Sequence, residues 1–320
     1  MRRLWLHIGS HKTGTSTLQR NLRQAKNRGL LGEYDYIHVK GQFQANPIIE
    51  ISGHGADMAP KVRTDLLGRL IDAVGDGDAV LSTEMLFWCY DPAQIQSLAA
   101  QLYSQFDEIK IVVYLRRQDA LALSHRKQVI MGVAALKFYG CQIAALPDYA
   151  PHLHRYFDYE TKLSLWSDAF GHDALVVRRF EPMSLQGGDT VNDFFGLIGV
   201  PFEKHVADVN QALSRSAVLA GLWLRQKGYP RRSFEPLLYA IKDVPLRPAR
   251  ADAYSFYDHF RSSNMRLATR YDPLGPSAFF TENFETYPEV GNDKFIDLTV
   301  NLDALEAQAQ RRLATLQVGL

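Results

Sequence analysis

Short apolar runs that alternate with helical patterns are the feature that most constrains how this chain can fold. The clearest run, residues 109–115, is nearly continuous in its apolar character and rich in β-branched side chains. Continuous apolar strands are typical of a parallel sheet that is covered on both faces. The runs that we expect to form strands are residues 4–8, 36–39, 79–82, 109–115 and 174–177.

Apolar residues at helical spacing occupy the intervals between these runs. Strands that alternate with helices predict an α/β fold, in which helices flank a parallel sheet. The helices that we expect in this part of the chain are one that opens at Thr15 and runs past Leu22, and others over residues 64–74, 91–103, 119–131 and 161–170.

The last third of the chain has a different character. Its apolar spacing is helical over residues 212–271, and residues 297–316 read as a closing helix. No low-complexity linker or internal repeat separates this part from the rest. We therefore expect a single domain over residues 1–320, with an α/β nucleotide-binding core over 1–205 and a helical extension over 206–320 on the acceptor side.

The composition limits the possible classes of protein. Hydrophobic residues make up 46% and charged residues 22% of the chain, as in ordinary globular proteins, which excludes a largely disordered chain. The 36 basic and 35 acidic residues give a net charge of +1. This balance provides no general electrostatic attraction for nucleic acid, so we expect no nucleic-acid partner.

The N-terminus and the two cysteines indicate a cytoplasmic protein. The apolar run after Arg2 and Arg3 is too short for a signal peptide and is interrupted by His7. No segment approaches the ~20 apolar residues of a membrane span, so we expect no integral membrane segment. Cys89 and Cys141 are expected to be free thiols in a reducing compartment.

The turn between the first strand and the first helix has the composition of a phosphate-binding loop. A strand, a glycine-containing turn and a helix together direct backbone N–H groups and the positive helix end at one spot, which favours an anion. Gly9 and Gly14 are five residues apart, as in the loop of nucleotide triphosphatases. The lysine, however, is Lys12 inside the loop, and Thr15 follows the second glycine. Ser16 stands where a metal-binding hydroxyl would lie, and it could equally bond a phosphate oxygen directly.

A second group of polar residues follows the strand at residues 109–115. Arg116 comes at the end of the strand, and Ser124 lies eight residues further on in the expected helix. Open α/β sheets place ligands at the carboxyl ends of their strands. An arginine and a hydroxyl there can hold a second phosphate. The alternative is a solvated charge pair of Arg116 and Arg117 beside an ordinary helix serine.

The two groups together resemble the sulfotransferases that use 3′-phosphoadenosine 5′-phosphosulfate (PAPS). In that family a K-[TS]-G-[TS]-[TS] loop binds the 5′-phosphosulfate, and an arginine with a serine eight residues later binds the 3′-phosphate. Residues 12–16, Arg116 and Ser124 match in type, order and spacing. The resemblance covers roughly residues 3–200 and is thin afterwards. Other motifs that look like the bacterial branch are residues 114–119, 178–181, 193–199 and 263–271.

This resemblance implies a P-loop-type fold and a PAPS-dependent transfer. The sulfuryl group would pass in line, without a metal, to a hydroxyl or less commonly an amine of a sugar, a glycolipid or a small molecule. Lys12 would stabilise the leaving group. The residues implied in binding the cosubstrate are Lys12, Thr13, Gly14, Thr15, Ser16, Thr17, Arg116 and Ser124.

The acceptor hydroxyl requires a general base, and Glu84 is our candidate. Glu84 lies just past an expected strand end, which places it at the same edge of the sheet, and related enzymes use a Glu or a His there. It could instead cap a helix or pair with a cation. His11 and His125 are rival bases, and His11 could instead contact the sulfate.

Two other functions stay open for this sequence. One is a P-loop nucleotide-dependent kinase, although the displaced lysine and the lack of a clear metal-binding acid argue against it. The other is a catalytically silent scaffold that binds a phosphonucleotide. His152 and His154 form a pair without further ligands at suitable spacing, so we expect no metal site. The acceptor and the oligomeric state cannot be read from the sequence.

Overall fold

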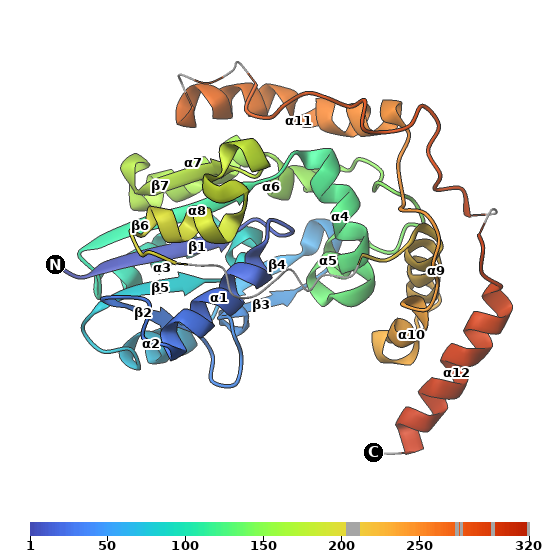
Figure 1. Cartoon of the computed structure of the whole chain (residues 1–320), viewed down its shortest axis with the longest axis horizontal. Coiled ribbons are helices and arrows are strands. Elements are labelled where there is room, and N and C mark those ends of the chain that lie inside the picture. Colours follow the sequence, from blue (N-terminus) through green and yellow to red (C-terminus); the bar gives the residue numbers. More distant parts are fainter. Residues whose placement is uncertain (203–211, 273–274, 276–277, 296–297, 319–320) are drawn as a thin grey trace.

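A computed structural model describes residues 1–202, 212–272, 275, 278–295 and 298–318 (Figure 1). Its centre is a five-stranded parallel sheet with the order β2-β5-β1-β6-β7. All five predicted strands are present, and the predicted α/β class is confirmed. The strands are β1 (Arg3–Gly9), β2 (Tyr34–Ile37), β5 (Asp78–Ser82), β6 (Glu108–Leu115) and β7 (Leu175–Arg179).

The strand order places β1 in the middle of the sheet. From β1 the chain first builds β2 and β5 on one side and then β6 and β7 on the other. Two backbone hydrogen bonds join the carboxyl ends of the central strands, from Thr83 N to His7 O at 3.0 Å and from Ser10 N to Tyr114 O at 2.9 Å. The chain changes the direction in which it adds strands at β1. Open α/β sheets bind ligands at the carboxyl ends of the strands beside such a switch point.

Successive side chains of a strand point to opposite faces of the sheet, and apolar side chains occur on both faces. Helices therefore pack on both faces of this sheet. In β1, Leu4 and Leu6 pack into one core with α3 and α7, whereas Trp5 packs into another with α1 and α8. The helices of this part are α1 (Thr15–Asn27), α2 (Thr64–Asp72), α3 (Pro92–Tyr103), α4 (Gln118–Met131), α5 (Val133–Tyr139), α6 (His154–Phe157), α7 (Tyr159–Phe170) and α8 (Thr190–Leu197).

The last third is helical, as expected, and builds a second core with Val129 and Ile130 of α4. The continuous pattern over residues 212–271 is divided into separate helices, because Gly228 adopts φ 86° and Pro230 precedes the next helix. The helices are α9 (Arg215–Gln226), α10 (Arg231–Leu238), α11 (Arg250–Tyr271) and α12 (Leu302–Val318). The expected division between residues 205 and 206, and the expected helix start at 297, lie outside the described residues.

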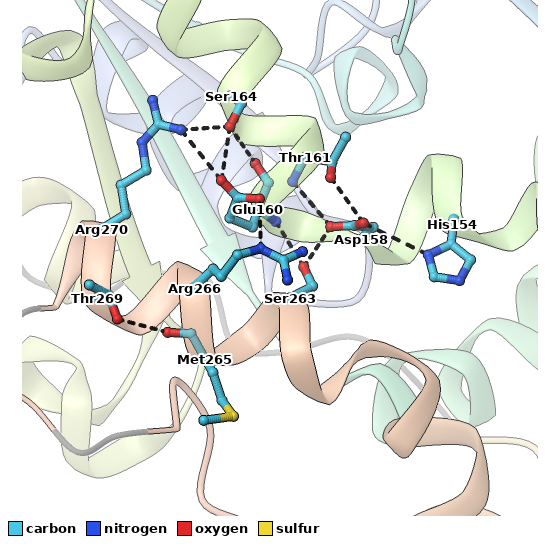
Figure 2. A network of polar contacts seen from close by, with 10 residues as sticks. All are labelled: His154, Asp158, Glu160, Thr161, Ser164, Ser263, Met265, Arg266, Thr269 and Arg270. Atoms are coloured by element: carbon cyan, nitrogen blue, oxygen red, sulfur yellow. Dashed lines mark hydrogen bonds and ion pairs between the residues drawn. The ribbon is translucent and has the colours of Figure 1, made fainter.

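Helix α11 is fastened to the core by polar contacts with α4 and α7. Gln118 and Asn264 exchange two buried amide hydrogen bonds, of 2.8 and 3.0 Å. Figure 2 shows Glu160 of α7 between two arginines of α11, with ion pairs of 3.4 Å to Arg266 and 3.5 Å to Arg270. The long helix thereby lies across the core, as Figure 1 shows.

An antiparallel hairpin of β3 (Ile49–Ser52) and β4 (Ala59–Val62) was not predicted. Its strands have four residues each and contain Pro60, so their sequence signal is weak. Helices α5, α6 and α8 were also missed because they are short. The remaining elements are 3-10 helices at Asn46–Ile48, Gly55–Asp57, Glu84–Trp88, Pro151–Leu153, His172–Ala174, Pro182–Ser184 and Gln186–Gly188.

Two further sequence expectations can be compared with the structure. Cys89 and Cys141 both carry free thiols. Among the described residues, no helix combines the length and the apolar character that crossing a bilayer requires.

Candidate active site

The loop between β1 and α1 folds around one carbonyl group. Ser10 O accepts hydrogen bonds from the hydroxyls of Thr13 at 2.7 Å and Thr15 at 3.3 Å. Gly14 is the N-cap of α1 and has φ 82°. A Cβ atom at this position would lie 3.0 Å from Thr190 Oγ1, which itself donates to Thr13 O at 2.7 Å. The positive φ and the close approach both require glycine at position 14.

The N-terminus of α1 is available to an anion. Its N-cap residue, Gly14, has no side chain that could cap the helix. The positive end of the helix dipole and the N–H groups at the start of the helix can therefore face a bound anion. Ser16 is exposed in the first turn, whereas Thr17 is buried. The hydroxyls of Thr13 and Thr15 donate within the loop, so its backbone and Ser16 are the groups best placed to meet a ligand.

Lys12 has an unusual backbone conformation. Among the described residues it is the one non-glycine residue with positive φ, at 62°. Such a conformation costs free energy and tends to persist at functional sites. Arg116, which follows β6, donates from Nη1 to Lys12 O at 3.2 Å. The two basic residues that the sequence analysis selected are thus in direct contact.

Lys12, Arg116 and Ser124 line one cleft of about 330 Å³. Lys127 of α4 also lines it, so three cations meet in this cleft, and none of its described lining residues is a carboxylate. The opposite wall is apolar and comes mainly from the helical extension. The other lining residues are Ala120, Leu123, Ala212, Leu213, Val218, Pro245 and Leu246.

The electrostatics of the cleft favour an anionic ligand. Burial, together with the charges of Lys127 and Arg116, lowers the pKa of Lys12 to about 8, although Glu84 acts in the opposite direction. Among the described residues, no carboxylate forms an ion pair with Lys12 or Arg116. An anion bound here would replace the missing countercharge, so the cleft suits a ligand with several negative charges.

Glu84 is the first residue of the 3-10 helix that follows β5. It lies against the end of β1, since a Cβ atom on Gly9 would be only 2.9 Å from Glu84 Cα. Thr83, rather than Glu84, caps the 3-10 helix by accepting from Met85 N. The carboxylate accepts hydrogen bonds from side-chain amides and forms no ion pair among the described residues. The alternative roles of cap and ion-pair partner are therefore not seen.

His11 and His125 belong to a buried aromatic cluster around Trp88. The Nδ1 atom of His11 lies 2.7 Å from the Tyr156 hydroxyl, and that of His125 lies 2.7 Å from the Tyr139 hydroxyl. Burial lowers the pKa of His11 to about 3 and that of His125 well below its usual value. Burial therefore disfavours the protonated form that either imidazole would have to adopt as a general base.

The structure brings only part of the predicted site into the cleft. Of the predicted site residues, the ones that do not line the cleft are residues 13–17, Glu84 and His11, although they lie at the same edge of the sheet. Lys127 was missed, although it follows Ser124 by three residues and therefore shares its helix face. The apolar wall could not be predicted from the sequence, because tertiary packing brings Leu213 and Leu246 to the cleft.

The described residues contain no group of three or more His, Cys, Asp or Glu arranged to hold a metal ion. His152 Nε2 lies 3.1 Å from the Phe138 carbonyl oxygen, and His154 lies 3.8 Å from Asp158. The expected absence of a metal remains a prediction.

Comparisons with known proteins give limited matches. No protein-family model matches the sequence. An uncharacterized protein of Archaeoglobus fulgidus is 29% identical over 113 residues, which cover 34% of this chain and only 28% of that relative's length. A crystal structure of a sulfotransferase from Alicyclobacillus acidocaldarius aligns with 71% of this chain and 95% of its own, at 18% identity and a TM-score of 0.39. The fold is defined by the strand order of the parallel sheet.

Proposed function

We propose that this protein is a sulfotransferase that moves a sulfuryl group from PAPS to an acceptor hydroxyl. The observation that carries the proposal is the convergence of Lys12, Arg116 and Ser124 on one cleft whose described lining residues include no carboxylate. These residues come from two separate strand ends and one helix. Their arrangement supports the binding of a ligand with two separate anionic groups, which PAPS has.

The cleft and the start of α1, three residues after Lys12, have separate roles in this proposal. Lys12 and the N-terminus of α1 would bind the 5′-phosphosulfate, and Arg116 with Ser124 would bind the 3′-phosphate. The apolar wall, which includes Val218 and Leu246, would contact the uncharged parts of the nucleotide or acceptor. The helical extension would thus form the acceptor side.

The proposed reaction is an in-line displacement at sulfur. The acceptor oxygen forms a bond to sulfur, and the bond from sulfur to the bridging oxygen breaks, which releases 3′-phosphoadenosine 5′-phosphate (PAP). Negative charge grows on the leaving oxygen, and the Lys12 ammonium neutralises it. The proton of the acceptor hydroxyl passes to a carboxylate base, for which we propose Glu84. The acceptor class remains a sugar, glycolipid or small-molecule hydroxyl.

A calorimetric titration tests this function directly. We expect PAP to bind without metal and ATP with Mg²⁺ to bind much more weakly. At 100 times its dissociation constant, PAP should raise the free energy of unfolding by about 2.7 kcal/mol. Preference for Mg-ATP would favour the kinase and contradict the roles of Arg116 and Ser124. PAP binding without any sulfuryl transfer to a mixed acceptor pool would favour the silent scaffold.

A further inference from the structure

The Glu84 carboxylate is held by two neutral amides from different parts of the chain. Gln19 of α1 donates from Nε2 to one carboxylate oxygen at 2.9 Å, and Asn46 donates from Nδ2 to the other at 3.1 Å. Asn46 begins a 3-10 helix that precedes the β3–β4 hairpin. Helix α1 and the hairpin segment therefore meet at this one side chain.

Both amides are themselves fixed in orientation. The Oδ1 atom of Asn46 accepts from the Thr83 hydroxyl at 2.8 Å, which directs its NH₂ group to Glu84. The Nε2 atom of Gln19 also donates to Ser82 O at 3.3 Å. Because Thr83 and Ser82 immediately precede Glu84, the two amides hold both the backbone and the carboxylate of this segment.

Neutral amides are better partners than a cation for a carboxylate that must accept a proton. Hydrogen bonds to the charged form favour the ionised carboxylate without cancelling its charge. A carboxylate can accept about four hydrogen bonds, so two donors leave acceptor capacity for an incoming hydroxyl. Other titratable groups whose charges interact with Glu84 are Lys12 of the phosphate loop, Tyr36 of β2 and Tyr156 of α6.

We propose that Gln19 and Asn46 are positioning residues, which hold the ionised Glu84 carboxylate in one orientation to receive the proton of the acceptor hydroxyl. This assignment rests on the proposed sulfotransferase function. It makes the hairpin segment, through Asn46, part of the support of the site.

The test is carboxyl ¹³C NMR of glutamate-labelled protein with PAP bound, recorded at one fixed pH. The signal of Glu84 is assigned by its loss in Glu84→Gln. We expect its chemical shift to change in Gln19→Met, because one of the two hydrogen bonds to the carboxylate is lost. In Asn46→Asp the acceptor for Thr83 is retained but the donor to Glu84 is lost, so the Glu84 signal should shift in this variant as well.

A matched control is Gln101→Met on α3, whose amide donates to Thr64 O at 2.8 Å and does not contact Glu84. This variant should leave the Glu84 signal unchanged. Binding of PAP within about twofold of wild type shows that each variant is folded. The second readout is the rate of sulfate release from PAPS to water, which needs no identified acceptor. Its kcat should fall by about 10-fold in Gln19→Met and Asn46→Asp, because a misoriented base accepts the proton less well, whereas the KM for PAPS should stay within about twofold of wild type.

Three results would overturn the assignment. The first is an unchanged Glu84 signal and an unchanged kcat in both variants that still bind PAP, which would make the two amides structural only. The second is full transfer activity in Glu84→Gln, which would remove Glu84 as the base. The third is a wild-type protein that neither binds PAP nor releases sulfate, which would end the proposed function and this assignment with it.

Discussion

Lys12 combines a strained backbone with a partly suppressed charge. Its positive φ places the residue inside the turn, and Arg116 holds its carbonyl oxygen there. Burial and neighbouring cations disfavour its ammonium form, and a bound anion would restore it. The positive φ and the disfavoured ammonium form both cost free energy of folding. Such a cost is expected at a residue that serves ligand binding rather than stability.

For Lys12→Ala we expect sulfuryl transfer to fall by at least about 100-fold, because the charge on the leaving oxygen loses its partner. Turnover of the variant measures this loss.

The same residue should make the binding of PAP pH-dependent. In the free protein its pKa is about 8, so wild-type affinity for PAP should weaken as the pH rises through this value. Calorimetry from pH 7 to 9 should show this trend in the wild type and lose it in the variant. Unchanged turnover in Lys12→Ala would contradict the proposed role of Lys12 in stabilising the leaving group.

Arg116→Ala should reveal which phosphate Arg116 contacts. We expect affinity for PAP to fall by about 10- to 100-fold, as for the loss of a charge-assisted hydrogen bond. Affinity for AMP, which lacks the 3′-phosphate, should change little. Titrations with the two nucleotides provide the comparison, and equal losses would show that Arg116 does not hold the 3′-phosphate.

Lys162 should give the stability a measurable dependence on pH. Its buried ammonium donates to the carbonyls of Phe87 at 2.9 Å and Cys89 at 3.4 Å, and burial lowers its pKa from 10.5 to about 7. Between these values the unfolded chain binds more protons than the folded one, so the free energy of unfolding should rise with pH. Urea denaturation from pH 7 to 9.5 should show a smaller rise in Lys162→Met. Parallel curves would contradict this assignment.

At the scale of elements, helices α7 and α11 are held together by polar contacts near the start of α7. Helix α7 is capped by Asp158, which accepts from Thr161 N at 3.1 Å and from the Ser263 hydroxyl of α11. One carboxylate thus satisfies the start of α7 and holds α11 beside it, as Figure 2 shows. Nearby, Arg266 of α11 makes a more exposed contact with Glu160.

This difference predicts an order of stability losses. Asp158→Ala should lower the free energy of unfolding by about 1–2 kcal/mol, because a helix cap and an interhelical hydrogen bond are both lost. Arg266→Ala should cost less than about 1 kcal/mol, since its side chain is 56% exposed and its ion pair is screened. Chemical denaturation of both variants measures the difference, and equal costs would contradict it.

At the scale of the whole molecule, the cleft joins two parts of the chain. Its charged side comes from the α/β core, and its apolar side comes from α9 and the segment around Leu246. The second hydrophobic core, which includes Val129 of α4 and Leu219 of α9, holds these sides together. A ligand that fills the cleft must therefore contact both parts.

Hydrogen exchange can test this coupling. Binding of PAP should slow amide exchange in the phosphate loop and at the start of α4, and also in α9 near Val218. The protection of α9 follows from its place in the cleft wall. Mass spectrometry of the free and bound protein gives the comparison. Protection confined to the core would show that the nucleotide does not reach the helical extension.

The parallel sheet and the strand–turn–helix loop around Gly14 could be predicted from the sequence, because both depend on local patterns. Continuous apolar strands, helical spacing and the glycines of one turn are properties of neighbouring residues. The sequence also predicted that Arg116 and Ser124 lie near one another, because the two residues belong to one strand–helix unit.

Contacts between distant segments determine which residues share the cleft and which side chains hold Glu84. Gln19, Asn46 and Glu84 are far apart along the chain, and their hydrogen bonds exist only after the strands have paired. The apolar wall likewise depends on how α9 packs against α4. Such contacts result from packing between distant segments, and a local sequence pattern carries no record of them.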